Sequence, residues 1–318
     1  MACCYAELGK QKEAVEALEK AIRAGLLNFR MIENEKRLAK VRETEAYKKL
    51  MKRRTELAKE GIRAKVRFYR NLLGESYHYE VLDEQHLALV LGVPKERYEK
   101  AKKRLKELCD GLRKLLFKRP PDTYITVMVV PSLQDWTRKL RHSPRSLGGY
   151  APEDMVLAIR TMRALYHEFT HALHFADQDA LDQKHPCWVA EGLACLFEAF
   201  RKKNGDIIGV SNHRLGRLKR EIKEGKAIPW RQLFRMERSE FMRRSKSTYA
   251  ASGFIMRYLQ EKGLLARWYK EYTEHYKDDP TGAKALEKVL GCKIDEAERR
   301  WKKWVTQQKE EPKFFPGD

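Results

Sequence analysis

Hydrophobic positions follow helical spacing along most of the chain, and a few short stretches depart from it. Residues 95–118 carry Tyr, Ala and Leu side chains three or four positions apart, which predicts one long amphipathic helix. Residues 124–130 are rich in β-branched side chains and end at a proline, which predicts a buried strand. Alternation at 77–82 and a short apolar run at 155–159, preceded by the glycine-containing segment 148–150, predict further strands. The middle of the chain should therefore contain a small sheet with helices around it.

Helical patterns occupy both ends of the chain. Residues 1–50 predict short antiparallel helices separated by glycines, and the basic stretch that follows predicts a helical connector. Apolar and aromatic side chains at helical spacing also continue through the C-terminal third. We therefore predict an α+β fold with a helical hairpin and connector at 1–74, a mixed central domain at 75–200, a helical C-terminal subdomain at 201–310 and a frayed tail at 311–318.

The net charge of +21 makes an anionic partner worth considering. Lys and Arg are nevertheless spread along the chain with Glu between them, and no known nucleic-acid-binding module is recognisable. The two densest basic stretches, 36–70 and 214–246, have helical spacing, which is typical of solvated helix faces. We therefore keep nucleic-acid binding only as the least favoured alternative.

Cysteine usage and hydropathy bear on the compartment. The six cysteines form no CxxC pair and are too sparse for a disulfide scaffold, which indicates reduced thiols. No run of 18 apolar residues occurs, and residues 1–10 lack the basic and apolar regions of a secretory signal. We expect a soluble, cytoplasmic protein without a membrane span.

The candidate chemistry lies at 161–177, which is predicted to be a helix. This segment contains the string HEFTH at 167–171, whose four-residue spacing places His167 and His171 on one helix face. Such a string arises by chance in some sequences, so a further signal is needed. Glu191 supplies one, because it lies in a second predicted buried helix and a carboxylate is a suitable third ligand for a zinc ion whose fourth position holds water.

The two motifs together resemble the gluzincin clan of zinc metallopeptidases, in which H-E-x-x-H is followed by a Glu in a Trp-x-x-Glu-Gly-Leu-Ala helix, here at 188–194. Residues 2–21 resemble a tetratricopeptide repeat, and a largely uncharacterised, bacterial-type subfamily of gluzincin-like proteins carries such repeats before the zincin domain. The resemblance extends to the helical tail around 247–251. It implies a zincin-like catalytic domain, with a small mixed sheet, an HExxH helix and a helix carrying the Glu ligand, that acts on a peptide or protein substrate. The repeat-like segment implies a possible protein partner.

The expected mechanism uses zinc held by His167, His171 and Glu191 to make hydroxide available at neutral pH. Glu168 would act as the general base and later return the proton to the leaving amine. Gluzincins commonly stabilise the oxyanion with a downstream Tyr or His. The resemblance therefore implies Tyr249 as the oxyanion donor, with His213 as runner-up.

One position departs from the thermolysin-like pattern. Cys195 stands where those relatives have an Asp that orients a histidine ligand, so the acceptor would be Glu198, Asp177 or a backbone carbonyl. His174 and Cys187 lie near the motifs, but a structural histidine and a buried cysteine are the commoner roles, and we exclude both as ligands.

Two other functions remain open on the sequence. In one, the fold is an inactive zincin-like scaffold that binds a partner through its helical repeat and basic surface. The presence of all four chemical positions, His167, Glu168, His171 and Glu191, favours an active hydrolase. In the other, the same groups hydrolyse a carbonyl substrate that is not a peptide.

Overall fold

The computed structural model describes residues 1–118, 123–210 and 213–309. These residues form an α+β fold with one five-stranded mixed sheet, so the predicted fold class is confirmed at that level. The chain divides into two compact units. The first contains Met1–Lys102 and Pro121–Met162, and the second contains Lys103–Pro120 and Arg163–Asp318. The four segments predicted from the sequence stay a prediction, and the tail at 311–318 lies outside the described residues.

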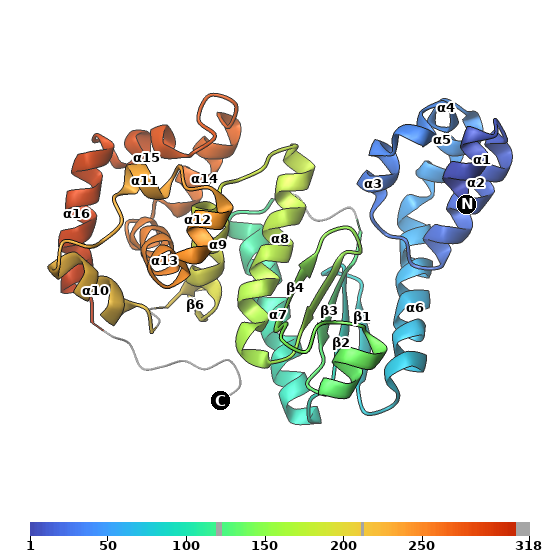
Figure 1. The fold of residues 1–318 in the computed structure, drawn as a ribbon, viewed down its shortest axis with the longest axis horizontal. Coiled ribbons are helices and arrows are strands. Elements are labelled where there is room, and N and C mark those ends of the chain that lie inside the picture. Colours follow the sequence, from blue (N-terminus) through green and yellow to red (C-terminus); the bar gives the residue numbers. More distant parts are fainter. Residues whose placement is uncertain (119–122, 211–212, 310–318) are drawn as a thin grey trace. The chain divides into compact units, whose positions relative to one another are not determined.

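The first unit begins with a set of helices (Figure 1), and these helices share an apolar core. Gly9 and Gly25 end the first two of them with φ of +74° and +109°, a backbone conformation that glycine adopts at little cost. Gly61 lets the last helix approach the second, because a Cβ there would lie 2.2 Å from the carbonyl oxygen of Ile22. These helices are α1 (Ala2–Glu7), α2 (Gln11–Arg23), α3 (Phe29–Asn34), α4 (Ala39–Arg42), α5 (Glu45–Lys52) and α6 (Arg54–Leu73).

The sheet of the first unit has the strand order β1-β2-β3-β5-β4 (Figure 1). Its strands are β1 (His78–Leu82), β2 (Leu87–Leu91), β3 (Ile125–Val129), β4 (Gly148–Ala151) and β5 (Val156–Ile159). The two outer pairs are antiparallel, whereas β2, β3 and β5 run parallel. β2, β3 and β5 are buried along their whole lengths, as expected for parallel strands covered on both faces.

The second unit is mostly helical and holds the sequence motifs. Large aromatic side chains fill its core, and Trp188, Trp268 and Trp301 are fully buried. α7 (Lys95–Leu115) contributes residues to both units. The remaining elements are α8 (Leu165–Leu181), α9 (Cys187–Phe197), β6 (Phe200–Lys203), β7 (Asp206–Gly209), α10 (Leu215–Lys223), α11 (Trp230–Leu233), α12 (Arg238–Arg243), α13 (Ser245–Glu261), α14 (Leu265–Glu274), α15 (Ala283–Leu290) and α16 (Ile294–Gln307).

Glycines set the position of α9. Gly192 on α9 and Gly253 on α13 lie where the two helices meet: a Cβ on Gly192 would be 3.0 Å from the Ser252 carbonyl oxygen, and one on Gly253 would be 2.9 Å from Cys195 Cβ. Gly209, at the end of β7, approaches the other end of α9. The backbone of α9 is therefore in close contact with both α13 and β7.

Among the described residues, no helix is both long and apolar enough to cross a membrane.

Replacing Gly209 should destabilise the second unit. A Cβ at this position would lie 2.3 Å from the carbonyl oxygen of Leu196, so Gly209→Ala must displace the end of α9. We expect the free energy of unfolding in urea to fall by about 1–3 kcal/mol, the usual range for overpacking. Gly149→Ala is the control, because nothing lies within 4 Å of a Cβ there. Equal stability of the two variants would contradict the role of Gly209.

Candidate metal centre

The helix α8 presents the two motif histidines side by side. Leu165, Phe169 and Leu173 are buried and hold one face of the helix against the core. His167 and His171 stand one turn apart on another face, and their Nε2 atoms are 3.2 Å from each other. The helical spacing predicted from the sequence therefore brings the two nitrogens together.

The helix α9 adds a carboxylate to this pair. Glu191 Oε2 lies 3.3 Å from Nε2 of His167 and 3.3 Å from Nε2 of His171. The three atoms thus form a nearly equilateral triangle. The side chains are 12%, 20% and 8% exposed for His167, His171 and Glu191, so water has little access to them.

The triangle fits the geometry of a zinc site. Ligand atoms at roughly 2.0–2.1 Å from one tetrahedral ion lie about 3.3–3.4 Å apart, which matches the observed spacing. Within the described residues, the buried Oε2 of Glu191 has no well-aligned hydrogen-bond donor, although the two imidazole nitrogens lie 3.3 Å from it. A buried carboxylate oxygen in that condition is costly unless a cation satisfies it. His167, His171 and Glu191 are therefore suited to hold a zinc ion.

The charges in the metal-free protein show how strongly the three groups interact. Burial raises the pKa of Glu191, but the two imidazoles outweigh burial and hold this pKa well below its usual value. Burial opposes charge on His167, yet the neighbouring Cys195, Glu191 and Glu198 raise the pKa of its ring well above the ordinary value. The site thus retains positive charge beside Glu191 even without a metal.

Glu168 lies in a different environment from the other carboxylates. Its side chain is half-buried, and it has no hydrogen bond or ion pair with the residues that the structure describes. Its charge is close enough to Tyr249 to contribute to the raised pKa of that phenol. A carboxylate beside the ligands that is not engaged by another side chain is suited to accept a proton.

The structure also brings Tyr249 to the same place. Its ring stacks against the ring of His167, with centroids 6.0 Å apart, and it lies on α13. Burial and the charge of Glu191 raise the pKa of Tyr249 above its ordinary value, so the phenol keeps its proton. A protonated phenol is a hydrogen-bond donor, as an oxyanion stabiliser must be.

The runner-up and the excluded residues occupy other positions. His213 is exposed in the turn before α10. Cys187 is the first residue of α9, and burial raises the pKa of its thiol, which disfavours the thiolate form needed by a metal. His174 is buried and pairs with His185.

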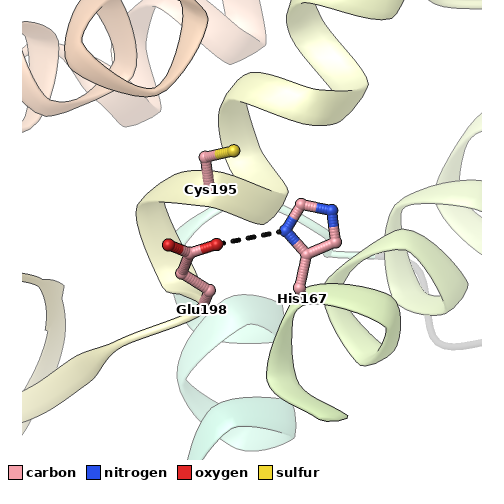
Figure 2. A group of neighbouring side chains, drawn as sticks. All are labelled: His167, Cys195 and Glu198. Carbon is pink, nitrogen blue, oxygen red and sulfur yellow. Dashed lines mark ion pairs between the residues drawn. The ribbon is translucent and has the colours of Figure 1, made fainter. Parts of the chain in front are cut away.

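Glu198 faces Nδ1 of His167, the ring nitrogen that is not part of the triangle (Figure 2). Its Oε2 lies 3.4 Å from Nδ1 of His167, and its Oε1 forms an ion pair with Arg214. Sequence reasoning named Glu198 among three candidate acceptors, whereas it missed Arg214. Nothing in the local sequence marks Arg214, because it reaches Glu198 only through the tertiary fold.

His167 belongs to a second group that could hold a metal, formed with Cys195 and Glu198. Two observations disfavour that group as a ligand set. Arg214 already neutralises Glu198, and a guanidinium next to a divalent ion is repelled by it. Burial also raises the pKa of the Cys195 thiol. The group of His167, His171 and Glu191 is the better candidate.

Comparisons with known proteins give no family for the chain. A scan against protein-family models finds no match, and a search of curated proteins finds no match either.

A buried histidine pair lies further along α8. Gln183 Nε2 donates to the Thr273 carbonyl at 2.7 Å, which turns its Oε1 toward Nε2 of His185 at 2.9 Å. His185 Nε2 must then carry a hydrogen, so its Nδ1 accepts from His174 Nε2 at 2.8 Å. Both rings are therefore neutral in this arrangement. The groups that face the pair are Phe117, Tyr269, Tyr272, Tyr276 and the carboxylate of Asp177, which accepts from Tyr269.

This pair should make the protein less stable at acidic pH. Burial lowers the pKa of His185 to about 3 and also lowers that of His174, whereas both would titrate near 6.5 when unfolded. The unfolded state then binds more protons below pH 6.5, so stability is complete above that value and is lost as pH falls toward 3. We expect each histidine to contribute up to about 1.4 kcal/mol per pH unit to this slope.

The measurement is the free energy of unfolding in urea between pH 7 and pH 4.5. His185→Gln keeps a hydrogen-bonding side chain but cannot titrate, so its slope should be smaller by about 1.4 kcal/mol per pH unit. A slope equal to that of the unaltered protein would show that His185 does not carry this effect.

Proposed function

We propose that this chain is a zinc-dependent metallopeptidase of the gluzincin type. The observation that carries the proposal is the convergence of three ligand atoms, from His167, His171 and Glu191, within 3.3 Å of one another. Two imidazoles and one carboxylate are the ligand set of known catalytic zinc sites that leave a fourth position open. The motif resemblance supports the gluzincin assignment.

When bound, zinc supplies Lewis-acid chemistry, since it acidifies water and polarises a carbonyl group. The chain's own carboxylates then have separate roles. Glu191 is buried and holds charge toward the ion, while Glu198 is engaged by Arg214. Glu168 is left to take a proton from water at its carboxylate and to deliver it to the leaving nitrogen.

Tyr249 would donate its phenolic hydrogen to the oxygen that becomes negatively charged during the reaction. Its ring packs against His167, which places the residue at the ligand cluster. Its raised pKa keeps that hydrogen in place at neutral pH. Donors of this kind act because they are already positioned when charge develops.

A peptide is favoured over other carbonyl substrates by the motif resemblance. The H-E-x-x-H string at 167–171 and the Trp-x-x-Glu-Gly-Leu-Ala string at 188–194 resemble those of gluzincins, which are peptidases.

Removing the general base should separate metal binding from turnover. Glu168→Gln keeps the shape of the side chain but cannot accept a proton, so we expect about one zinc per chain with peptide cleavage lowered by roughly 10²- to 10⁴-fold. The measurement combines metal analysis with cleavage of a mixed peptide library read by mass spectrometry. Glu274→Gln, on the exposed face of α14, is the matched control and should cleave normally.

A chelator should abolish cleavage by the unaltered protein, and added zinc should restore it. Zinc binding without cleavage of any peptide would instead favour an inactive scaffold or another substrate class. Absence of zinc binding would remove the basis of the proposal.

Tyr249→Phe should affect mainly the chemical step. The hydroxyl lies 3.6 Å from Met242 Sδ and also interacts with the carboxylate of Glu191, while the ring that stacks on His167 is kept in the variant. We expect kcat to fall by roughly 10²- to 10³-fold, the usual effect of removing one oxyanion donor, with zinc content unchanged. Steady-state kinetics on a peptide cleaved by the unaltered protein tests this. If Tyr249→Phe has the same kcat as the unaltered protein, Tyr249 contributes to packing and not to catalysis.

A further inference from the structure

Side chains from one face of α9 contact the ring of His167. Glu191, Cys195 and Glu198 occur at intervals of four and three residues, so they project from the same side of the helix and its C-terminal end. Glu191 lies at Nε2 of His167, and Glu198 lies at Nδ1 of the same ring. Both nitrogens of one imidazole are thus opposite carboxylates from a single helix.

The two carboxylates are held in different ways. Glu198 uses both of its oxygens, because Oε1 pairs with Arg214 while Oε2 faces His167. The side chains of Glu198 and Arg214 are 15% and 17% exposed, so the pair is largely shielded from water. Arg214 also lies over the ring of Tyr249, at 5.9 Å from its centroid. The orientation of Glu198 is therefore set by a partner from outside α9.

Cys195 lies beside His167 and Glu198. One ligand atom from each of His167, Cys195 and Glu198 lies within 4.8 Å of the others (Figure 2). A thiol is a weak hydrogen-bond acceptor, whereas a carboxylate is a strong one. Asp177, the other carboxylate considered for this role, accepts a hydrogen bond from Tyr269 at 2.7 Å.

We propose that Glu198, oriented by Arg214, is the positioning residue for His167: it accepts the Nδ1 hydrogen and so directs Nε2 toward the metal. This inference rests on the proposed zinc site. It assigns to Glu198 the part that an Asp four residues after the ligand Glu would play, a position filled here by Cys195. An acceptor at Nδ1 fixes both the ring orientation and the tautomer of a histidine ligand.

The alternative is that Glu198 and Arg214 form an ion pair that matters only for folding. The two roles differ in what a carboxylate at position 195 can do. If Glu198 serves as the acceptor for His167, then Cys195→Asp should compensate for its loss. If the pair only stabilises the fold, a carboxylate at position 195 should leave zinc affinity unaffected.

The test measures zinc affinity by competition with a chromophoric chelator, using folded, metal-free protein and zinc alone as the probe. Glu198→Gln should weaken zinc binding by about 10- to 100-fold, the usual effect of losing such a partner. The double variant Glu198→Gln with Cys195→Asp should recover most of that loss. Glu221→Gln is the matched control, because Glu221 is equally shielded at 15% exposure and lies beside an arginine, Arg217.

Urea unfolding of the metal-free variants gives the second readout. Recovered zinc affinity in the double variant, whatever the change in unfolding free energy, supports the positioning role. Glu198→Gln with the affinity of the Glu221→Gln control, or a loss that Cys195→Asp does not restore, overturns it. Failure of the unaltered chain to bind zinc would overturn the proposed function, and this inference with it.

Discussion

The buried carboxylate of Glu191 is the constraint on which the candidate site depends. Its side chain is 8% exposed, and a charge so far removed from water must be balanced by an opposite one. The two imidazoles of α8 lie 3.3 Å away and provide that balance in the metal-free protein. A divalent ion would take over the same task, so metal uptake should be coupled to release of a proton from His167, whose pKa is raised in the metal-free protein.

Backbone packing gives this electrostatic arrangement its geometry. Gly192 and Gly253 allow α9 and α13 to approach closely, and Gly209 abuts the end of α9. With its backbone fixed in this way, α9 presents Glu191 and Glu198 to opposite nitrogens of His167. The positions of the charged groups in the candidate site therefore depend on these glycines as well as on the charged residues themselves.

The sequence predicted much of this arrangement and missed other parts for identifiable reasons. Helical periodicity placed His167 and His171 on one face, and β-branched composition identified β3, because both signals are local. β2 was not predicted, since its short apolar run at Leu87–Leu91 does not distinguish a buried strand from a helix. Glu198 could not be selected over Asp177, and Arg214 could not be found, because both depend on contacts between distant segments.

The close spacing of the three candidate ligands in the chain has a consequence for folding. His167, His171 and Glu191 all lie on α8 and α9, two consecutive helices joined by a short connection. Bringing them together closes only a small loop, which costs little chain entropy. An ion bound there would link two helices that are neighbours in the sequence. The contacts between distant segments would still be determined by packing of the apolar core. Folding of this architecture should therefore not require the ion, and loss of a bound ion should leave the apolar core in place.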